Sequence, residues 1–153
     1  METLKIEKSE AKKIFKEGPE WLKKILTSIF GKEIFSEKIT DRIKTFEDAC
    51  NELCIDPEKV FNDSDSVDDK AYKKLKVIVM AINEGWEPDF NDMNQRKWFP
   101  YFTRSSGFGF STSDYYFALS YSLVGSRLYL ETEEKAIYVA NQFLNIYEEY
   151  YNK

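Results

Sequence analysis

Residues 98–130, WFPYFTRSSGFGFSTSDYYFALSYSLVGSRLYL, decide the fold class of this chain. Aromatic and β-branched side chains dominate four short runs in this stretch, and glycine, serine and aspartate separate the runs. Such a composition favours β-strands joined by tight turns. The sequence therefore predicts an antiparallel β-meander with strands at 98–102, 108–110, 115–124 and 127–130.

A helix is predicted to follow the meander. Thr132 is a favourable N-cap, and Glu133 and Glu134 in the first turn suit the positive end of the helix dipole. The side chains that recur at helical spacing and form the buried stripe of this helix are Ala136, Ala140, Phe143, Tyr147 and Tyr150. We expect this stripe to pack the helix against the sheet.

The first part of the chain carries helical signals. Ser9 is expected to cap a helix that ends at Gly18, after a short strand at 4–6. Pro19 suits the first position of a second helix, and Gly31 is expected to end it. The apolar face of that second helix is formed by Trp21, Leu22, Ile25, Leu26 and Ile29.

Two further helices are predicted from capping boxes. Thr45 with Asp48 opens one helix, and Ser66 with Asp69 opens another that runs to 84. A short helical turn is expected at 57–61. Gly85 is expected to end the helix that Ser66 opens. The predicted fold is thus α+β: N-terminal helices followed by an aromatic-rich antiparallel β-meander packed against a C-terminal helix. We predict an N-terminal helical appendage at 1–36 and a main domain at 37–153.

Composition and charge exclude several classes of protein. The 153 residues carry a net charge of −5, and the pI is near 5.0, which disfavours direct, sequence-specific DNA binding. No run approaches the ~20 apolar residues of a membrane span, so no membrane partner is expected. Cys50 and Cys54 lie one helical turn apart, where a disulfide would constrain little, and both are expected on a buried helix face. A reduced, cytoplasmic location is therefore expected.

The sequence offers few residues suited to catalysis or metal binding. The chain contains no histidine, which removes the commonest general base and transition-metal ligand. The segment from Asp63 begins like a calcium loop, but Asp68 and Lys74 occupy the positions that require glycine and glutamate. The 107–110 run matches the centre of an RNA-recognition motif only in part. We predict a protein that is not an enzyme, with no catalytic residue, no metal and no cofactor.

Three groups of residues are candidates for binding a partner. Asp63, Asp65, Asp68 and Asp69 form an acidic segment that either steers a basic partner or is a solvated loop with helix caps. Tyr115, Tyr116 and Tyr121 either offer rings to a partner or fill the core. Arg127 either binds a carboxylate or phosphate bidentately or pairs with Glu131 or Asp114.

Four segments in order, at 41–50, 81–86, 124–128 and 140–143, resemble a family of small, largely uncharacterised proteins of phages, prophages and mobile elements from Bacteroidetes-type bacteria. The resemblance spans about residues 41–150 and implies a phage context, in which small acidic proteins often inhibit host defence. The lysine-, isoleucine- and asparagine-rich composition suits a flavobacterial host. RNA-targeting type VI-B CRISPR nucleases occur in such hosts.

The resemblance implies an anti-CRISPR inhibitor that binds a host effector nuclease or its guide RNA complex and blocks guide RNA loading or activity. Two other functions stay open. One is a phage accessory or virion-associated protein that self-associates through its aromatic sheet. The other is a small-ligand sequestering module that uses Arg127 and nearby tyrosines.

Overall fold

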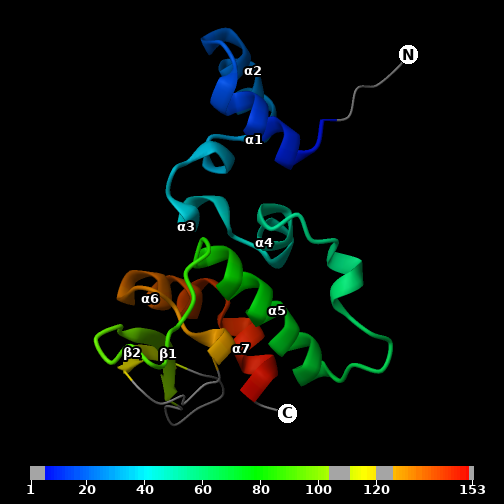
Figure 1. Ribbon diagram of the computed structural model, residues 1–153. Helices are drawn as coiled ribbons and strands as arrows, with labels where there is room; N and C mark the ends of the chain where they lie inside the picture. Colours follow the sequence, from blue (N-terminus) through cyan, green and yellow to red (C-terminus); the bar gives the residue numbers. More distant parts are fainter. Residues whose placement is uncertain (1–5, 104–110, 120–125, 152–153) are drawn as a thin grey trace.

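Helices before and after a small sheet make up the α+β fold (Figure 1). The computed structural model describes residues 6–103, 111–119 and 126–151. The α-helices are α1 (Lys8–Glu17), α2 (Glu20–Phe30), α3 (Ile39–Arg42), α4 (Phe46–Glu52), α5 (Val67–Ile82), α6 (Glu133–Gln142) and α7 (Leu144–Tyr151). The strands are β1 (Lys97–Thr103) and β2 (Ser111–Ala118), and three 3-10 helices are η1 (Glu33–Phe35), η2 (Pro57–Val60) and η3 (Ser126–Leu128).

Local capping interactions begin the helices of the main body at the predicted places. The Thr45 hydroxyl accepts from the Asp48 backbone N–H at 3.1 Å, and the Asp48 carboxylate accepts from the Thr45 N–H at 3.1 Å. Ser66 and Asp69 form the same reciprocal pair at the start of α5. Thr132 accepts from the backbone of Lys135 at 3.2 Å. Both capping boxes and the Thr132 cap are therefore confirmed.

The ends of the helices follow the sequence signals with small shifts: α5 ends at Ile82 rather than at 84, and Pro19 is the N-cap of α2 rather than its first residue. Gly31 ends α2 with φ +86°, and Gly85 follows α5 with φ +90°, a region that favours glycine. At the N-terminus α1 begins at Lys8, with Glu7 at the cap position rather than Ser9. The strand predicted at 4–6 falls mostly outside the described residues.

The sheet differs from the predicted meander. Within the described residues it has two antiparallel strands, which pair from Lys97↔Ala118 to Thr103↔Ser111 with an irregularity at Tyr101/Phe102. The predicted strand at 127–130 is wrong, because Ser126–Leu128 forms η3 and only Leu130 pairs with β1, in a single bridge to Trp98. The strand predicted at 108–110 and the end of the one at 115–124 lie outside the described residues.

Burial explains why residues 128–130 do not form a regular strand. Leu128, Tyr129 and Leu130 are all buried, with at most 2% of each residue exposed. A strand sends successive side chains to opposite faces, so a half-covered sheet would leave the middle residue of the three in water. This segment instead passes between α5 and the sheet and fills space on both sides.

The predicted C-terminal helix is divided in two. Phe143 leaves the helical region with φ −118° and ψ 28°, and this break separates α6 from α7. α7 then lies along α5 (Figure 1). The predicted stripe is confirmed, since Ala136, Ala140, Phe143 and Tyr147 are buried and Tyr150 is half-buried.

The main apolar core lies among α3 to α7 and the 128–130 segment. Leu75, Ile78 and Ile82 of α5 lie at its centre and are fully buried. A smaller cluster of Phe99, Ala118 and Tyr129 packs with Trp86 and Phe90 against the sheet. In the part of the chain that the structure describes, the buried residues of the main core begin at 39.

The N-terminal hairpin, residues 8–35, has its own small core. Ala11 of α1 and Leu26 of α2 are buried, and Phe15 stacks on Phe35 with ring centroids 4.1 Å apart. The hairpin projects from the rest of the fold in Figure 1. The predicted domain boundary at 36/37 stays a prediction. No helix in the described residues is long and apolar enough to cross a lipid bilayer.

Candidate functional site

The acidic segment mainly organises its own loop. The Asp65 carboxylate accepts from the Asn62 backbone N–H at 2.8 Å and pairs with Lys73 at 2.6 Å, and only 9% of its side chain is exposed. The Lys73 ammonium and the Asn62 N–H hold the pKa of Asp65 below its usual value. This carboxylate closes the 62–65 loop onto α5, so it is engaged within the chain.

The other acidic residues divide between capping and exposure. Asp69 accepts from the Ser66 hydroxyl at 2.6 Å, which is the main cause of its lowered pKa, and Asp68 accepts from the same hydroxyl at 2.7 Å. Asp63 is exposed in the loop, with no hydrogen bond or ion pair to another described residue. The structure therefore gives most of this segment a local role and leaves Asp63 the most accessible of its four carboxylates.

Of the three candidate tyrosines, Tyr116 has a described side chain. It is 56% exposed, and it packs edge-on against Phe99 across the strand pair, with ring centroids 6.1 Å apart. Tyr101 is 52% exposed. It lies on the same face as Tyr116, because it is two residues along β1 from Phe99, the register partner of Tyr116. Tyr115 lies in β2, but its side chain, like the whole of Tyr121, falls outside the description.

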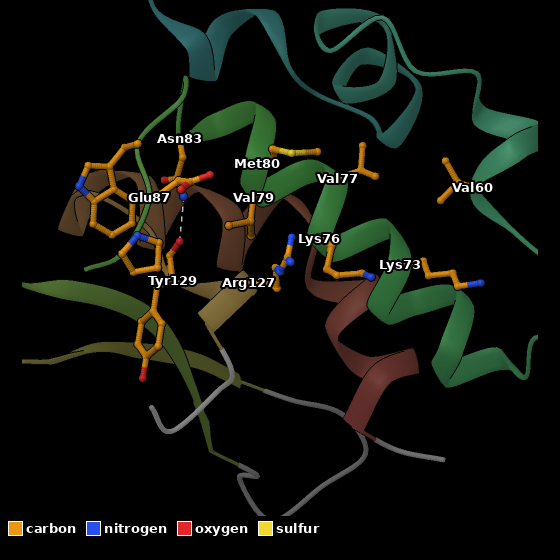
Figure 2. A pocket seen from close by; sticks show the side chains of 12 residues that line it. Val60, Lys73, Lys76, Val77, Val79, Met80, Asn83, Glu87, Arg127 and Tyr129 are labelled. Carbon is orange, nitrogen blue, oxygen red and sulfur yellow. Dashed lines mark hydrogen bonds between the residues drawn. The ribbon is translucent and has the colours of Figure 1, made fainter. Parts of the chain in front are cut away.

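Arg127 lies in a groove that the sequence did not reveal. The groove has a volume of about 500 Å³ and runs between α5, η3 and the segment after α5. Lys73 and Lys76 line it from α5, and Arg127 lines it from η3, as Figure 2 shows. Apolar side chains complete the lining, among them Met80 and Trp86. The sequence named Arg127 as a candidate but gave no signal that these residues would line the same groove.

The position of Arg127 is fixed by the residues that follow it. The buried Asn83 side chain donates to the Tyr129 carbonyl at 2.8 Å and accepts from the Glu131 N–H at 3.1 Å. Leu130 exchanges two backbone hydrogen bonds with Trp98, at 3.0 and 2.7 Å. Arg127 is thus an exposed residue at the beginning of a segment that is tied to both α5 and the sheet.

Of the two pairings considered as alternatives for Arg127, the one with Glu131 is not observed, and the one with Asp114 stays a prediction. Glu131 pairs instead with Lys135 at 2.7 Å, and the side chain of Asp114 lies outside the description. Among the described residues no carboxylate lies within ion-pairing distance of the Arg127 guanidinium. The arginine therefore keeps its hydrogen-bond donors available to a ligand.

The exposure of the apolar face of α2 was not predicted from the sequence. Trp21, Ile25 and Ile29 are 64%, 46% and 66% exposed, although they lie on the helix face that we expected to be apolar. Their spacing of four residues places them along one side of the helix. Leu26, on the neighbouring stripe, is the residue that α2 buries. The apolar pattern was visible in the sequence, but the absence of a covering element was not.

The two cysteines have different surroundings. Cys50 is fully buried in α4, and burial raises the pKa of its thiol to about 11, with Glu47 and Asp56 adding to the rise. The prediction that Cys54 is also buried is wrong. It follows the end of α4 with φ +56° and is exposed. The helix ends before reaching it, so the one-turn spacing does not hold.

Comparisons of the chain with protein-family models, curated protein sequences and solved structures gave no significant match. Within residues 6–103, 111–119 and 126–151, no three side chains of the metal-binding types cluster as a metal site would require. The surface features that could bind a ligand or partner are the α2 face, the groove around Arg127 and the exposed tyrosines of the sheet.

Proposed function

We propose that this protein is a non-enzymatic anti-defence protein, an anti-CRISPR inhibitor of the phage type, that binds a host effector nuclease. The proposed target is an RNA-targeting type VI-B nuclease, and the effect is to block guide RNA loading or activity. The four ordered segments that resemble phage and mobile-element proteins support the phage context. The surface of α2 supports a binding role.

The exposed face of α2 is the observation that carries this proposal. A tryptophan and two isoleucines in a row along one helix are the type of anchor that fills a hydrophobic groove on a partner protein. Each keeps about half or more of its surface in water in the isolated chain, an arrangement that exposes apolar area with no folding benefit. Burial of this face by a partner would recover that area.

Charge supports a basic partner. The chain has 27 acidic and 22 basic side chains. A nuclease that binds guide RNA carries a positively charged channel for the phosphates, and opposite surface charge speeds association. The accessible carboxylate of Asp63 fits this steering role better than Asp65 or Asp69, which are engaged within the chain.

A pull-down with the full-length tagged protein tests the proposal. The tagged chain is mixed with host extract that contains the type VI-B nuclease and its guide RNA, and we expect the nuclease to be recovered. The double variant Trp21→Ala, Ile29→Ala should reduce the affinity at least ~30-fold, the effect of losing a hot spot of about 2 kcal/mol. Recovery of no nuclease would contradict the proposed function.

A matched variant distinguishes the two exposed surfaces. Tyr101→Ala with Tyr116→Ala removes two exposed rings of the sheet and leaves α2 intact. We expect this variant to bind the nuclease with nearly unchanged affinity. The reverse pattern, with binding lost here and kept in the α2 variant, would move the interface to the sheet face.

Self-association through α2 is the second candidate, because the same exposed face would also fit a second copy of the chain. Sedimentation equilibrium separates the two functions. We expect a monomer at micromolar concentration. A dimer that dissociates in an Ile25→Asp variant would assign the face to self-association instead.

A further inference from the structure

The groove between α5 and η3 plays no part in the proposed docking through α2. We propose that this groove is a binding site for a nucleotide, with Arg127 and Lys76 holding its phosphate group. The inference stands on the groove alone and does not depend on the identity of any protein partner.

Uncompensated positive charge is the first argument. Arg127 and Lys76 line one groove from two different elements, and neither has a carboxylate partner among the described residues. The Lys76 ammonium lies over the Tyr72 ring, 5.0 Å from its centroid, and forms no ion pair with a described residue. Two like charges that face one groove repel each other, and a bound anion relieves that repulsion.

The other charged residues of the groove do not neutralise this pair. Lys73 is already paired with Asp65 at 2.6 Å, so its charge is satisfied outside the groove. Glu87 lies toward the Asn83 end, away from Lys76 and Arg127 in Figure 2. Among the described lining residues, the unpaired cations therefore lie at the α5–η3 end of the groove, and the one carboxylate, Glu87, lies at the opposite end.

Rigidity is the second argument. Arg127 begins the segment that Asn83 and Leu130 fasten to α5 and β1. Lys76 lies within α5, a helix of 16 residues whose inner face is buried in the main core. The backbone segments that carry the two cations are thus positioned relative to each other before any ligand arrives, which lowers the entropic cost of binding. The planar guanidinium is suited to two parallel hydrogen bonds to phosphate oxygens.

The apolar lining identifies the rest of the ligand. Met80 is 48% exposed beside the cations, and the half-buried Trp86 lines the same groove. A volume of about 500 Å³ falls in the range of about 300 to 1,000 Å³ that small-ligand sites occupy. An inorganic ion would leave the apolar part unused. A phosphate joined to a flat ring would fill both parts, with the ring against the indole or the thioether.

Titration calorimetry of the full-length protein tests the site with four probes: inorganic phosphate, uridine, uridine monophosphate and a short 5′-phosphorylated oligoribonucleotide. We expect the monophosphate to bind, and uridine and inorganic phosphate each to bind at least tenfold more weakly. Tighter binding of the oligoribonucleotide than of the monophosphate identifies an RNA end as the source of the phosphate. Equal binding identifies the free nucleotide.

Variants on two elements keep the test independent of folding. Arg127→Gln and Lys76→Gln should each weaken monophosphate binding at least tenfold, and Arg127→Lys should fall between wild type and Arg127→Gln because it keeps charge without the planar fork. Lys59→Gln is the control, since Lys59 is exposed on η2 and outside the groove. Circular dichroism checks that each variant is folded.

Several results would overturn the assignment. They are no binding of any phosphate probe at millimolar concentration, equal binding of uridine and its monophosphate, and unchanged binding in both glutamine variants. Binding of inorganic phosphate as tight as that of the monophosphate would also remove the nucleotide. The α2 variants should leave nucleotide binding unchanged, so a failed nuclease pull-down and a failed titration are separate results.

Discussion

The N-terminal hairpin and the main body are held by different forces. The main body buries a continuous apolar core around α5, whereas the hairpin buries little more than Ala11, Leu26 and the Phe15–Phe35 stack. The hairpin meets α4 through charge: Lys8 pairs with Asp48 at 3.3 Å, and Lys12 pairs with Glu52. A chain can therefore attach a helical pair to a folded body without extending the body's core.

The consequence of this difference is a difference in stability. Apolar burial is strong and insensitive to pH, while partly exposed ion pairs contribute little and depend on ionisation. We expect the hairpin to open at a lower free energy than the body. Substitutions in the two regions measure this difference in stability.

The largest effect is expected from Leu75→Ala in the centre of the main core. Leu75 is fully buried, so its truncation should lower the free energy of unfolding by about 3 to 4 kcal/mol. Leu26→Ala is the matched change in the hairpin and should increase hydrogen exchange in α1 and α2 while the thermal midpoint of the body stays near that of wild type. A single transition shifted equally by both variants would show that the two regions unfold as one unit.

Lys97 tests whether charge also matters inside the body. Its side chain is fully buried and donates to the carbonyls of Asp92, Gln95 and Leu119 at 3.2, 2.8 and 2.8 Å. Lys97→Met leaves these carbonyls without a donor and should cost about 2 to 3 kcal/mol in chemical denaturation. Arg96→Met, at the exposed neighbouring position, should cost less than ~1 kcal/mol. Equal costs would argue against the role of the buried ammonium.

Glu52 tests the charged junction. Burial raises the pKa of its carboxyl, but hydrogen bonds from Arg42 and Lys12 outweigh burial and leave the pKa below its ordinary value. A lowered folded-state pKa gives stability that is present above the unfolded value of about 4.3 and is lost as pH falls through the folded value. Glu52→Gln should therefore cost about 1 kcal/mol at pH 7 and much less near pH 3.

Hydrogen exchange at pH 7 locates that effect. In Glu52→Gln, exchange should rise in α1 and α2 more than in α5. Glu10→Gln, an exposed position in α1, is the control and should change neither region. A uniform rise over all helices would show that Glu52 supports the body rather than the junction.

Tyr147 should give the smallest effect. It is almost completely buried in α7, burial raises the pKa of its phenol, and its hydroxyl has no hydrogen-bond partner in the described structure. Tyr147→Phe removes a polar group that gains nothing from burial, so the free energy of unfolding should stay within ~0.5 kcal/mol or rise slightly. A loss above ~1 kcal/mol would reveal a partner for the hydroxyl.

Features that depend on neighbouring residues were predicted better than features that depend on contacts between distant parts of the chain. Thr45, Ser66 and Thr132 begin helices because a cap depends on residues within one turn, and a sequence displays these directly. The break at Phe143 has no glycine or proline to announce it and follows from packing around α5. Likewise, the β-favouring run at 128–130 is buried and does not form a regular strand, because neighbours far away in the chain cover all three side chains.

The candidate sites follow the same division. Arg127 was predicted from its own chemistry, but its grouping with Lys76 and Trp86 depends on how η3 crosses α5. The acidic residues were identified from the sequence. The loop geometry determines that Asp65 pairs with Lys73 and that Asp69 accepts from the Ser66 hydroxyl. The α2 face was visible as a pattern, and only the fold shows that nothing described covers it.

The exposure of Trp21, Ile25 and Ile29 has a consequence for how this protein changes over generations. These side chains lie largely outside every packed core, so replacing them costs the folded chain little. Under the proposed docking through α2, selection on binding would therefore be nearly uncoupled from selection on folding. These three positions could then change repeatedly while the packed body stays the same.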